Sequence, residues 1–381
     1  LEKQTEYAVE DADITFQLAQ HFRPELAEAK TDRLFEDIEV PLLRVLADME
    51  REGISLDKGF LNNLSTALDT AKDHEIIQNV LDYRGLTKLK STYVDALPEQ
   101  VEASGRVHTD YMQTVAATGR LSSNNPNLQN IPIRTERGRE VRKAFIPRNR
   151  EHVLLAADYS QIELRIIAAL SEEDTMIEAF KNGEDIHAST ASKVFNVPID
   201  EVSREQRSNA KTVNFVIIYG VSAFGLSNQT DLNRTEAKEL IDTYYKTYPK
   251  LRNYMSEHID FARENGYVQT VLGRRRYLKD INGSIQVVRG AAERNAVNAP
   301  IQGSAADIIK IAMINIHKKL SEGNYKTKML LQVHDELVFD CYQPELEEMK
   351  LLIKTEMENA YQMAVPLDVE VGIGENWLEA H

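Results

Sequence analysis

The sequence predicts an α+β protein built around an antiparallel sheet. Segments with helical periodicity come first, a strand-like run follows, further helical segments come next, and a hairpin stands near the end of the chain. The run VLLAA at residues 153–157 and the hairpin pattern at residues 328–340 supply the sheet. Helices and strands that are segregated along the chain in this way are typical of the α+β class.

The elements can be assigned in chain order from periodicity and from breaker residues. Gly53 marks a turn between helical patterns, and residues 104–150 are rich in Gly, Asn, Ser, Pro and Arg, so we expect an extended, loop-rich surface there. The other expected elements are helices at residues 5–30, 31–81, 161–170, 201–219, 235–265 and 307–320, strands at residues 153–158 and 267–272, and a hairpin at residues 328–340 whose tip is His334-Asp335.

The composition is that of an ordinary globular protein. The chain has 381 residues, 42% hydrophobic and 28% charged, so it can bury a large core in two or three domains. Its single cysteine, Cys341, excludes an internal disulfide, and we expect a reducing, cytoplasmic compartment. No apolar run approaches the ~20 residues that span a bilayer, so no membrane partner is expected. Because the chain opens with Leu1, we expect it to be part of a longer protein.

The net charge of −15 argues against a nucleic-acid partner only if the charge is spread evenly. Fields of exposed charges are screened beyond ~8–10 Å at physiological salt, so local clusters of charge determine whether a nucleic acid can bind. Residues 134–150 contain seven arginines and lysines against two glutamates, and residues 274–276 are three consecutive arginines. A charge run is usually a solvated face, so these clusters permit a nucleic-acid partner without demonstrating one.

Two acidic segments follow strand-like apolar runs. Asp158 follows residues 153–157, and Asp335 follows the run MLLQV at residues 329–333. An aspartate buried beside such a run is costly unless a cation or hydrogen bonds compensate it. If the two segments meet, their carboxylates repel each other unless divalent metal lies between them, and paired Mg²⁺ ions ~4 Å apart are a common solution for nucleotidyl transfer. Taken singly, each aspartate could simply cap a turn.

The helix expected at residues 201–219 carries two cations followed by two aromatic residues. Arg207, Lys211, Phe215 and Tyr219 recur every four residues and so lie along one gently winding face. The cations are suited to phosphates, and the rings to a sugar or a base. In the alternative, the rings belong to the core and the cations are solvated, but other apolar residues among 213–218 already supply a face for packing.

Together with further segments, these motifs resemble the polymerase domain of family A DNA polymerases. The order and spacing agree over roughly residues 100–381. The segments that carry the resemblance are DYSQIELR at residues 158–165 and VHDEL at 333–337 for the two palm motifs, RSNAKTVNFVIIYG at 207–220 for the fingers helix, and ATGRLSS at 117–123, NLQNIP at 127–132 and NAPIQGSAAD at 298–307 for stretches that follow primer and template.

The resemblance implies a right-hand architecture with an antiparallel-sheet palm, helical fingers and a helical thumb. It implies a DNA polymerase that adds deoxynucleotides to a primer 3′-hydroxyl in repair and replication, with primer–template DNA and dNTPs as partners and two Mg²⁺ ions as cofactors. A monomer in the bacterial cytoplasm, associated with the nucleoid, is expected. The implied divisions are an exonuclease-like remnant at residues 1–30, the thumb at 31–100, the palm at 101–171 and 291–381, and the fingers at 172–290.

The resemblance also implies roles for individual residues. Asp158 and Asp335 would bind metal together with the Tyr159 backbone carbonyl, and Glu163 would be a steric gate against ribonucleotides. Lys211 would assist catalysis, and Glu336 would support it. The implied nucleotide contacts are Arg207, Lys211, Phe215, Tyr219, His187, Glu163, Arg134 and Gln161, and the implied DNA contacts are Arg120, Asn130, Arg294, Asn298, Gln302 and His334.

The sequence departs from the family pattern at several positions. Val216 follows Phe215 where the family usually has Gly, and its β-branched side chain could alter the closing of the helix or pack inward. Ser208 replaces a second Arg, and Lys279 replaces a Pro. Between residues 72 and 77, where the family's thumb carries a helical tip, the sequence passes almost directly from one helix to the next. Either the tip is deleted, or its residues are disordered and not represented in the sequence. A true loss of the tip predicts weak duplex binding and low processivity with intact chemistry.

The first residues resemble the end of another domain. The segment YAVED at residues 7–11 is similar to the last motif of a proofreading 3′–5′ exonuclease, but no companion Asp-x-Glu motif precedes it in this sequence. Tyr7 and Asp11 are therefore expected to be a remnant, without proofreading in this chain.

Three other functions stay open at this point. A single-subunit RNA polymerase relative shares the palm carboxylates and the helix cation, but Glu163 and the lack of a promoter-reading extension argue against it. An inactive DNA-binding module, disabled at Val216 or in the thumb, is disfavoured by the intact carboxylates. A metal-dependent nuclease also uses paired carboxylates, but it does not need the ladder of two cations and two aromatic residues that runs from Arg207 to Tyr219.

Overall fold

The computed structural model describes residues 2–61, 76–133, 135–218, 220, 222–228, 230 and 232–381. Two predicted site residues, Arg134 and Tyr219, lie outside the described residues, and so do residues 72–75 of the expected thumb deletion; the side chain of Tyr7 is not described either.

The N-terminal half of the described chain alternates helices with short strands. Its elements are α1 (Glu2–Glu28), α2 (Asp32–Leu34), a π-helix (Phe35–Glu39), α3 (Val40–Glu52), β1 (Ile54–Leu56), α5 (Ile76–Leu89), a π-helix (Lys90–Asp95), α6 (Ala96–Glu99), β2 (Arg106–Val107), β3 (Asp110–Met112), β4 (Ser122–Asn124), a 3-10 helix (Leu128–Asn130), α7 (Glu136–Glu140), a 3-10 helix (Val141–Ala144), β5 (Phe145–Ile146) and β6 (His152–Tyr159).

Longer helices dominate the second half. Its elements are α8 (Ile162–Leu170), α9 (Asp174–Lys181), α10 (Ile186–Phe195), a 3-10 helix (Ile199–Glu201), α11 (Arg204–Ile218), α12 (Ala223–Ser227), α13 (Arg234–Thr247), α14 (Pro249–Asn265), β7 (Tyr267–Gln269), β8 (Arg275–Tyr277), α15 (Gln286–Glu322), β9 (Lys328–Val333), β10 (Glu336–Tyr342), a 3-10 helix (Gln343–Glu345), α16 (Leu346–Glu358), β11 (Val369–Gly374) and α17 (Trp377–Ala380).

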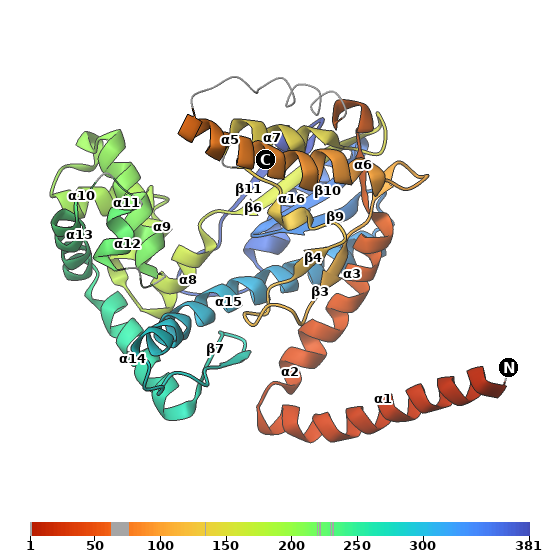
Figure 1. The fold of residues 1–381 in the computed structure, drawn as a ribbon, viewed down its shortest axis with the longest axis horizontal. Coiled ribbons are helices and arrows are strands. Elements are labelled where there is room, and N and C mark those ends of the chain that lie inside the picture. The colour runs from red at the N-terminus through yellow and green to blue at the C-terminus, as the bar shows by residue number, and fades with distance from the viewer. Residues whose placement is uncertain are drawn as a thin grey trace.

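A four-stranded antiparallel sheet forms the centre of the fold (Figure 1). Its strand order is β11-β6-β10-β9, and β9 and β10 form the predicted hairpin. The unbroken apolar run of β6 reflects burial on both faces: Leu155 and Ala157 belong to the larger core cluster, while Leu154 and Ala156 belong to a second cluster that contains Trp377. The predicted α+β class with an antiparallel sheet is confirmed.

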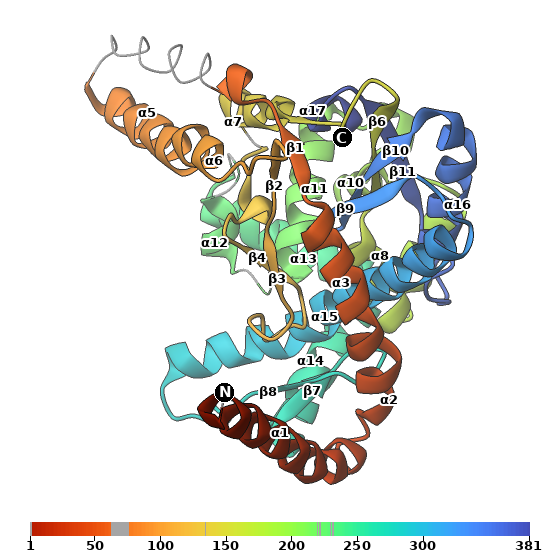
Figure 2. The same ribbon diagram turned by 90° about the vertical axis from the view of Figure 1, so that its right-hand side faces the viewer.

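The long helix α15 crosses the molecule beside this sheet (Figures 1 and 2). It begins at Gln286, so the expected start at residue 307 was wrong. Tertiary packing keeps the segment 298–307 helical, with Pro300 inside the helix. Gly303 allows a close crossing, because a Cβ there would lie 2.5 Å from Thr270 Cγ2.

The helices α9 to α13 form a lobe to one side of the sheet (Figure 1). On the other side, α3 buries Leu42, Val45, Leu46 and Met49, which share one helical face. It ends at Gly53, whose φ of 60° favours glycine and where a Cβ would lie 2.6 Å from the His108 ring.

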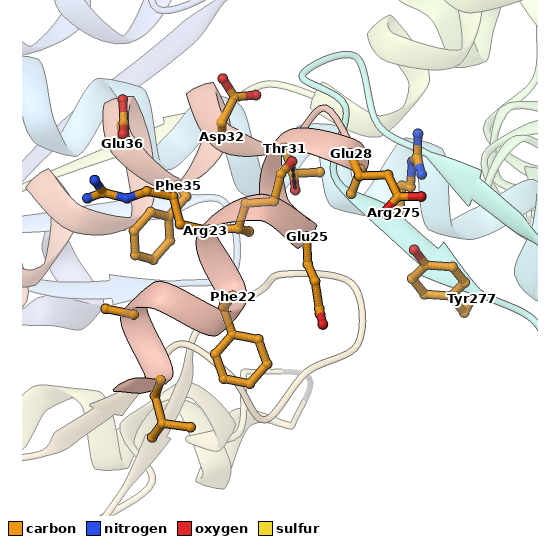
Figure 3. Close-up of a pocket in the computed structure, with 14 residues that line it drawn as sticks. Phe22, Arg23, Glu25, Glu28, Thr31, Asp32, Phe35, Glu36, Arg275 and Tyr277 are labelled. Atoms are coloured by element: carbon orange, nitrogen blue, oxygen red, sulfur yellow. Dashed lines mark hydrogen bonds between the residues drawn. The ribbon is translucent and has the colours of Figure 1, made fainter. Parts of the chain in front are cut away.

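The first helix projects away from the rest of the fold (Figures 1 and 2). Between α1, α2 and β8 lies a groove bordered by Leu18, Phe22, Phe35 and Tyr277 (Figure 3). These four side chains are between 46% and 63% exposed, so the groove is apolar and open. Among the described helices, none combines the length and apolar character that crossing a bilayer demands.

Candidate active site

The two predicted acidic segments meet at one end of the central sheet. Asp158 stands at the end of β6, and Asp335 lies in the turn that joins β9 to β10. Glu336 is the cross-strand partner of Asp158, and the Tyr159 amide donates a hydrogen bond to the Asp335 carbonyl at 3.2 Å. The sheet register therefore brings together two carboxylates that are 177 positions apart in the sequence.

The charges at this end of the sheet oppose one another. Burial, reinforced by the charge of Glu336, raises the pKa of Asp158 to about 6. Burial also raises the pKa of Asp335 to about 7, with Glu163 and Asp158 adding to the effect. A divalent cation would relieve both carboxylates, because it supplies positive charge where two anions are forced together.

The available donors fit Mg²⁺ or a similar hard cation, which prefers carboxylate and carbonyl oxygens. Within the described ranges, no group of three or more His, Cys, Asp or Glu side chains is arranged to hold a metal ion. The acidic part of the candidate site is thus the Asp158–Asp335 pair, and the Tyr159 carbonyl remains the predicted third ligand.

Glu336 is enclosed on the other side by the end of the chain. It is 3% exposed, and the Trp377 indole N–H donates to its two oxygens at 3.2 and 3.3 Å. The His381 ring nitrogen Nδ1 lies 3.1 Å from Glu336 Oε1, and Arg142 Nη1 lies 3.8 Å from Oε2. Arg142 also stacks on the Trp377 ring, 4.2 Å from its centre. These contacts hold Glu336 in place beneath Asp158.

Arg120 reaches the site from the loop that precedes β4. It forms an ion pair with Glu163, whose side chain is buried in the first turn of α8. Gln161 occupies the N-cap of α8 in the left-handed conformation, with φ of 56°. Two predicted DNA contacts are exposed. Asn130 lies at the end of the 3-10 helix Leu128–Asn130, and His334 lies in the turn between β9 and β10.

Sequence reasoning missed two glutamines that brace the turn. His334 has φ of 55°, and the Gln332 side-chain amide donates to its carbonyl at 2.5 Å. Gln129 donates to Gln332 Oε1 at 2.9 Å and accepts from the Ser123 amide at 3.2 Å. The signal in the sequence was a polar residue, Gln332, inside an otherwise apolar strand.

The cation–aromatic ladder lies on α11 as predicted for its first three members. Arg207 and Lys211 are exposed, and Phe215 is half-buried. Arg207 Nε is 2.7 Å from Asp185 Oδ2. The side chain of Val216 packs inward, because it is 7% exposed and belongs to the main core. It therefore does not project from the ladder face.

His187 stands beside the ladder on α10. It is 2% exposed, and its ring centre lies 5.8 Å from that of Phe215. Burial, together with the charges of Lys211 and Arg207, lowers the pKa of His187 to about 4. The ring is consequently neutral at physiological pH.

Three predicted DNA contacts share one stretch of α15. Arg294, Asn298 and Gln302 recur every four residues, and Arg294 is exposed while the other two are half-buried. The Asn298 Oδ1 atom is buried and has no hydrogen-bond partner among the described residues. Arg294 packs against Gly220, where a Cβ would come within 3.1 Å of Arg294 Cγ.

Some members of the basic clusters are interior cations, although Arg137, Arg139 and Arg150 are exposed. Arg142 is 2% exposed, and Arg148 forms an ion pair with the buried Asp340. Arg274 forms ion pairs with Glu39 and with Asp307, so the triplet at residues 274–276 starts with an interior cation. The positive charge of Arg142, Arg148 and Arg274 is therefore neutralised by acidic partners within the protein.

The described chain combines an antiparallel sheet that ends in paired carboxylates with a cation-bearing helix in the lobe to one side of it, an arrangement that fits the class of nucleic-acid polymerases. The sequence pattern of DNA polymerase family A matches residues 3–379. The chain therefore belongs to DNA polymerase family A.

Named relatives agree with this assignment. The chain is 50% identical to DNA polymerase I of Streptococcus pneumoniae over 338 residues, which cover 87% of this chain and 38% of the relative. It is 41% identical to DNA polymerase I of Lactococcus lactis subsp. cremoris over 445 residues, covering 99% of this chain and 51% of the relative. The chain thus spans about two fifths to one half of the length of these relatives.

The second of these alignments exceeds the 381 residues of the chain, so at least 64 of its 445 positions have no counterpart here. Among solved structures, the POL domain of Pol1 from M. smegmatis, in complex with DNA primer-template and dNTP, is 40% identical. It superimposes with a TM-score of 0.90 over 96% of this chain and 74% of that one. Family membership sets aside the RNA polymerase and nuclease alternatives.

Proposed function

We propose that the chain is a template-directed DNA polymerase that adds deoxynucleotides to a primer 3′-hydroxyl, without proofreading. The observation that carries the proposal is the meeting of Asp158 and Asp335 at the sheet end, together with a helix of the neighbouring lobe that exposes Arg207 and Lys211. The M. smegmatis neighbour has the same fold and is bound to a DNA primer-template and a dNTP, which supports the proposal that this chain binds the same two kinds of ligand.

The assignment of regions follows from this proposal. Residues 101–171 and 291–381 would be the palm, 172–290 the fingers and 31–100 a shortened thumb. We expect the chain to act as a monomer in DNA repair and replication.

The carboxylates of Asp158 and Asp335 and the carbonyl of Tyr159 would hold two Mg²⁺ ions. The ions, when bound, would lower the pKa of the primer hydroxyl and neutralise charge on the triphosphate. Glu336 would keep Asp158 in position through the cross-strand pairing of β10 with β6.

The helix α11 would present the nucleotide. Arg207 and Lys211 would bind phosphates, with Lys211 stabilising charge as the pyrophosphate leaves, and Phe215 would lie against the sugar. Release of Arg207 from Asp185 would accompany phosphate binding, since one guanidinium cannot serve both anions with the same N–H. His187, Gln161, Tyr219 and Arg134 would complete the nucleotide contacts.

The remaining predicted residues would contact the primer and template. Arg120, released from Glu163, would reach the minor groove, where acceptor positions are shared by all correct base pairs. Glu163 would then crowd a ribose 2′-hydroxyl. The other proposed DNA contacts are Asn130, Arg294, Asn298, Gln302 and His334.

Extension of a primed DNA template with Mg²⁺ and dNTPs tests the proposal. The parent chain should extend the primer, and Asp335→Ala should not, while both bind duplex. Asp242→Ala is the matched control, because Asp242 is exposed on α13 and away from the carboxylate pair. Failure of the parent to extend a duplex that it binds would instead favour the inactive DNA-binding module.

A further inference from the structure

A chain of buried polar side chains runs through the helical lobe behind the ladder of α11. His187 and Thr190 belong to α10, Asn214 belongs to α11, and Tyr248 is the N-cap residue of α14. Their exposed fractions are 2%, 0%, 0% and 0%, respectively. Buried polar groups cost free energy unless they are hydrogen-bonded, so the hydrogen bonds among these four side chains fix their arrangement.

The hydrogen bonds lead from one residue to the next. Asn214 Nδ2 lies 3.0 Å from His187 Nδ1 and 3.2 Å from Thr190 Oγ1. The Thr190 hydroxyl donates to Asn214 Oδ1 at 3.3 Å and lies 3.1 Å from the Tyr248 hydroxyl. Asn214 is the central member, because it alone touches both the histidine and the threonine.

The orientation of the Asn214 amide indicates the tautomer of the histidine. A carboxamide nitrogen can only donate, so His187 Nδ1 accepts from Asn214 Nδ2. A neutral imidazole that accepts at Nδ1 must carry its proton on Nε2. The neighbouring cations Lys211 and Arg207 and the burial of the ring all favour the neutral form.

We propose that Asn214 is a positioning residue for nucleotide binding, which holds His187 as the tautomer that offers Nε2–H to the triphosphate. The inference rests on the proposed function, in which His187 contacts the nucleotide. With the proton on Nε2, the ring donates to a phosphate oxygen. With the proton on Nδ1, it would turn a lone pair toward that oxygen and repel it. Asn214 therefore decides the sign of the contact without touching the ligand.

The other buried polar side chains of this set hold the Asn214 side chain itself. Its amide could rotate by half a turn and exchange its oxygen and nitrogen, which would reverse the tautomer. The Thr190 hydroxyl contacts both amide atoms, donating to Oδ1 and accepting from Nδ2, and so holds the plane of the amide against partial rotation. The N-terminus of α10 holds the histidine backbone as well, because Asp185 accepts from the His187 amide at 2.9 Å and from the Ala188 amide at 3.1 Å.

The first experiment reads the tautomer directly. In protein labelled with ¹⁵N-histidine and free of nucleotide, the imidazole shifts of His187, assigned by their loss in His187→Gln, should report a proton on Nε2. Asn214→Asp places an acceptor where the donor stood and should move the proton to Nδ1. Asn209→Asp, also on α11 but outside the buried chain, should leave the tautomer unchanged. A proton on Nδ1 in the parent overturns the inference.

The second experiment measures the consequence for the nucleotide. Asn214→Asp should raise KM for dNTP about tenfold, the size of one lost hydrogen bond to a charged group, with a smaller change in kcat. In a His187→Ala background the same substitution should change KM less than twofold, because the residue through which it acts is gone. An equal change in both backgrounds would mean that Asn214 acts through general packing, and it would overturn the inference.

A second variant guards against a folding defect. If Asn214→Asp does not fold, Thr190→Val removes the hydroxyl that steadies the amide, and it should produce a mixture of both tautomers with a KM about two- to fivefold higher. If Thr190→Val shows the same single tautomer as the parent, the role given to Thr190 is refuted. If the parent neither extends primers nor binds dNTP, the proposed function fails and the nucleotide role with it. An Nδ1–H tautomer in a chain that extends primers overturns this inference alone.

Discussion

Replacing Asp335 by Asn is expected to stabilise the folded, metal-free chain at alkaline pH, although it removes a carboxylate that we assign to catalysis. Burial, with Glu163 and Asp158 nearby, raises the pKa of Asp335 from 3.8 to about 7. When folding raises the pKa of an acid, the contribution of that acid to stability is fully present only at pH values below its pKa in the unfolded chain. That contribution is lost as the pH rises from about 4 through about 7.

The structure gives the size of the effect. A pKa difference of about three corresponds to roughly 4 kcal/mol once the carboxylate is ionised in both states. Because the side chain of Asp335 keeps some contact with water, part of that cost is screened, and a gain of about 1–3 kcal/mol at pH 8 is expected for Asp335→Asn. The gain should shrink toward pH 5, where folding protonates the parent residue.

Urea unfolding at pH 8 and pH 5, in the presence of EDTA, measures this gain. Asp242→Asn on the exposed face of α13 is the matched control and should change little. Replacing EDTA by millimolar Mg²⁺ should stabilise the parent and narrow its difference from the variant. An Asp335→Asn chain that is less stable than the parent, or equally stabilised at both pH values, would refute the electrostatic reasoning.

Three further predictions concern selectivity and packing. Glu163→Ala should raise ribonucleotide incorporation about tenfold or more in single-nucleotide extension, because the proposed gate is removed. Lys310→Met should cost about 3–5 kcal/mol in urea unfolding, since Lys310 is fully buried and its loss takes away a cation that lies 2.9 Å from Glu39. Gly303→Ala should cost about 1–3 kcal/mol, because the new Cβ would meet Thr270 at 2.5 Å.

Each of these has an outcome that would count against it. Unchanged sugar selectivity in Glu163→Ala would remove the gate assignment. A Lys310→Met chain no less stable than Lys238→Met, an exposed control on α13, would mean that the buried ion pairs contribute nothing net. Full stability in Gly303→Ala would show that α15 can move away from the strand β7 region at little cost.

The sheet and its carboxylates could be predicted because their signals are local. Asp158 and the His334-Asp335 turn each follow an apolar strand, and pairing of antiparallel strands then brings them together. The ladder of α11 was equally visible as a four-residue repeat of Arg207, Lys211 and Phe215. Each of these patterns is complete within one element.

What the sequence did not reveal depends on contacts between distant elements. Arg274 looked solvated, but its partners Glu39 and Asp307 come from other helices. Asn214 carries no periodic signal, because its role depends on the distance to a histidine 27 positions earlier. Val216 could have faced either way, and only the packing of α11 against the core decides it.

The most direct test of the central claim is the template dependence of a single addition. Four primed templates that differ only at the first unpaired base are each offered the four dNTPs separately with Mg²⁺. The account predicts that only the complementary nucleotide is added efficiently to each, and that Asp158→Asn adds none while still binding duplex. Addition of the same nucleotide to all four templates, or extension that survives Asp158→Asn, would contradict it.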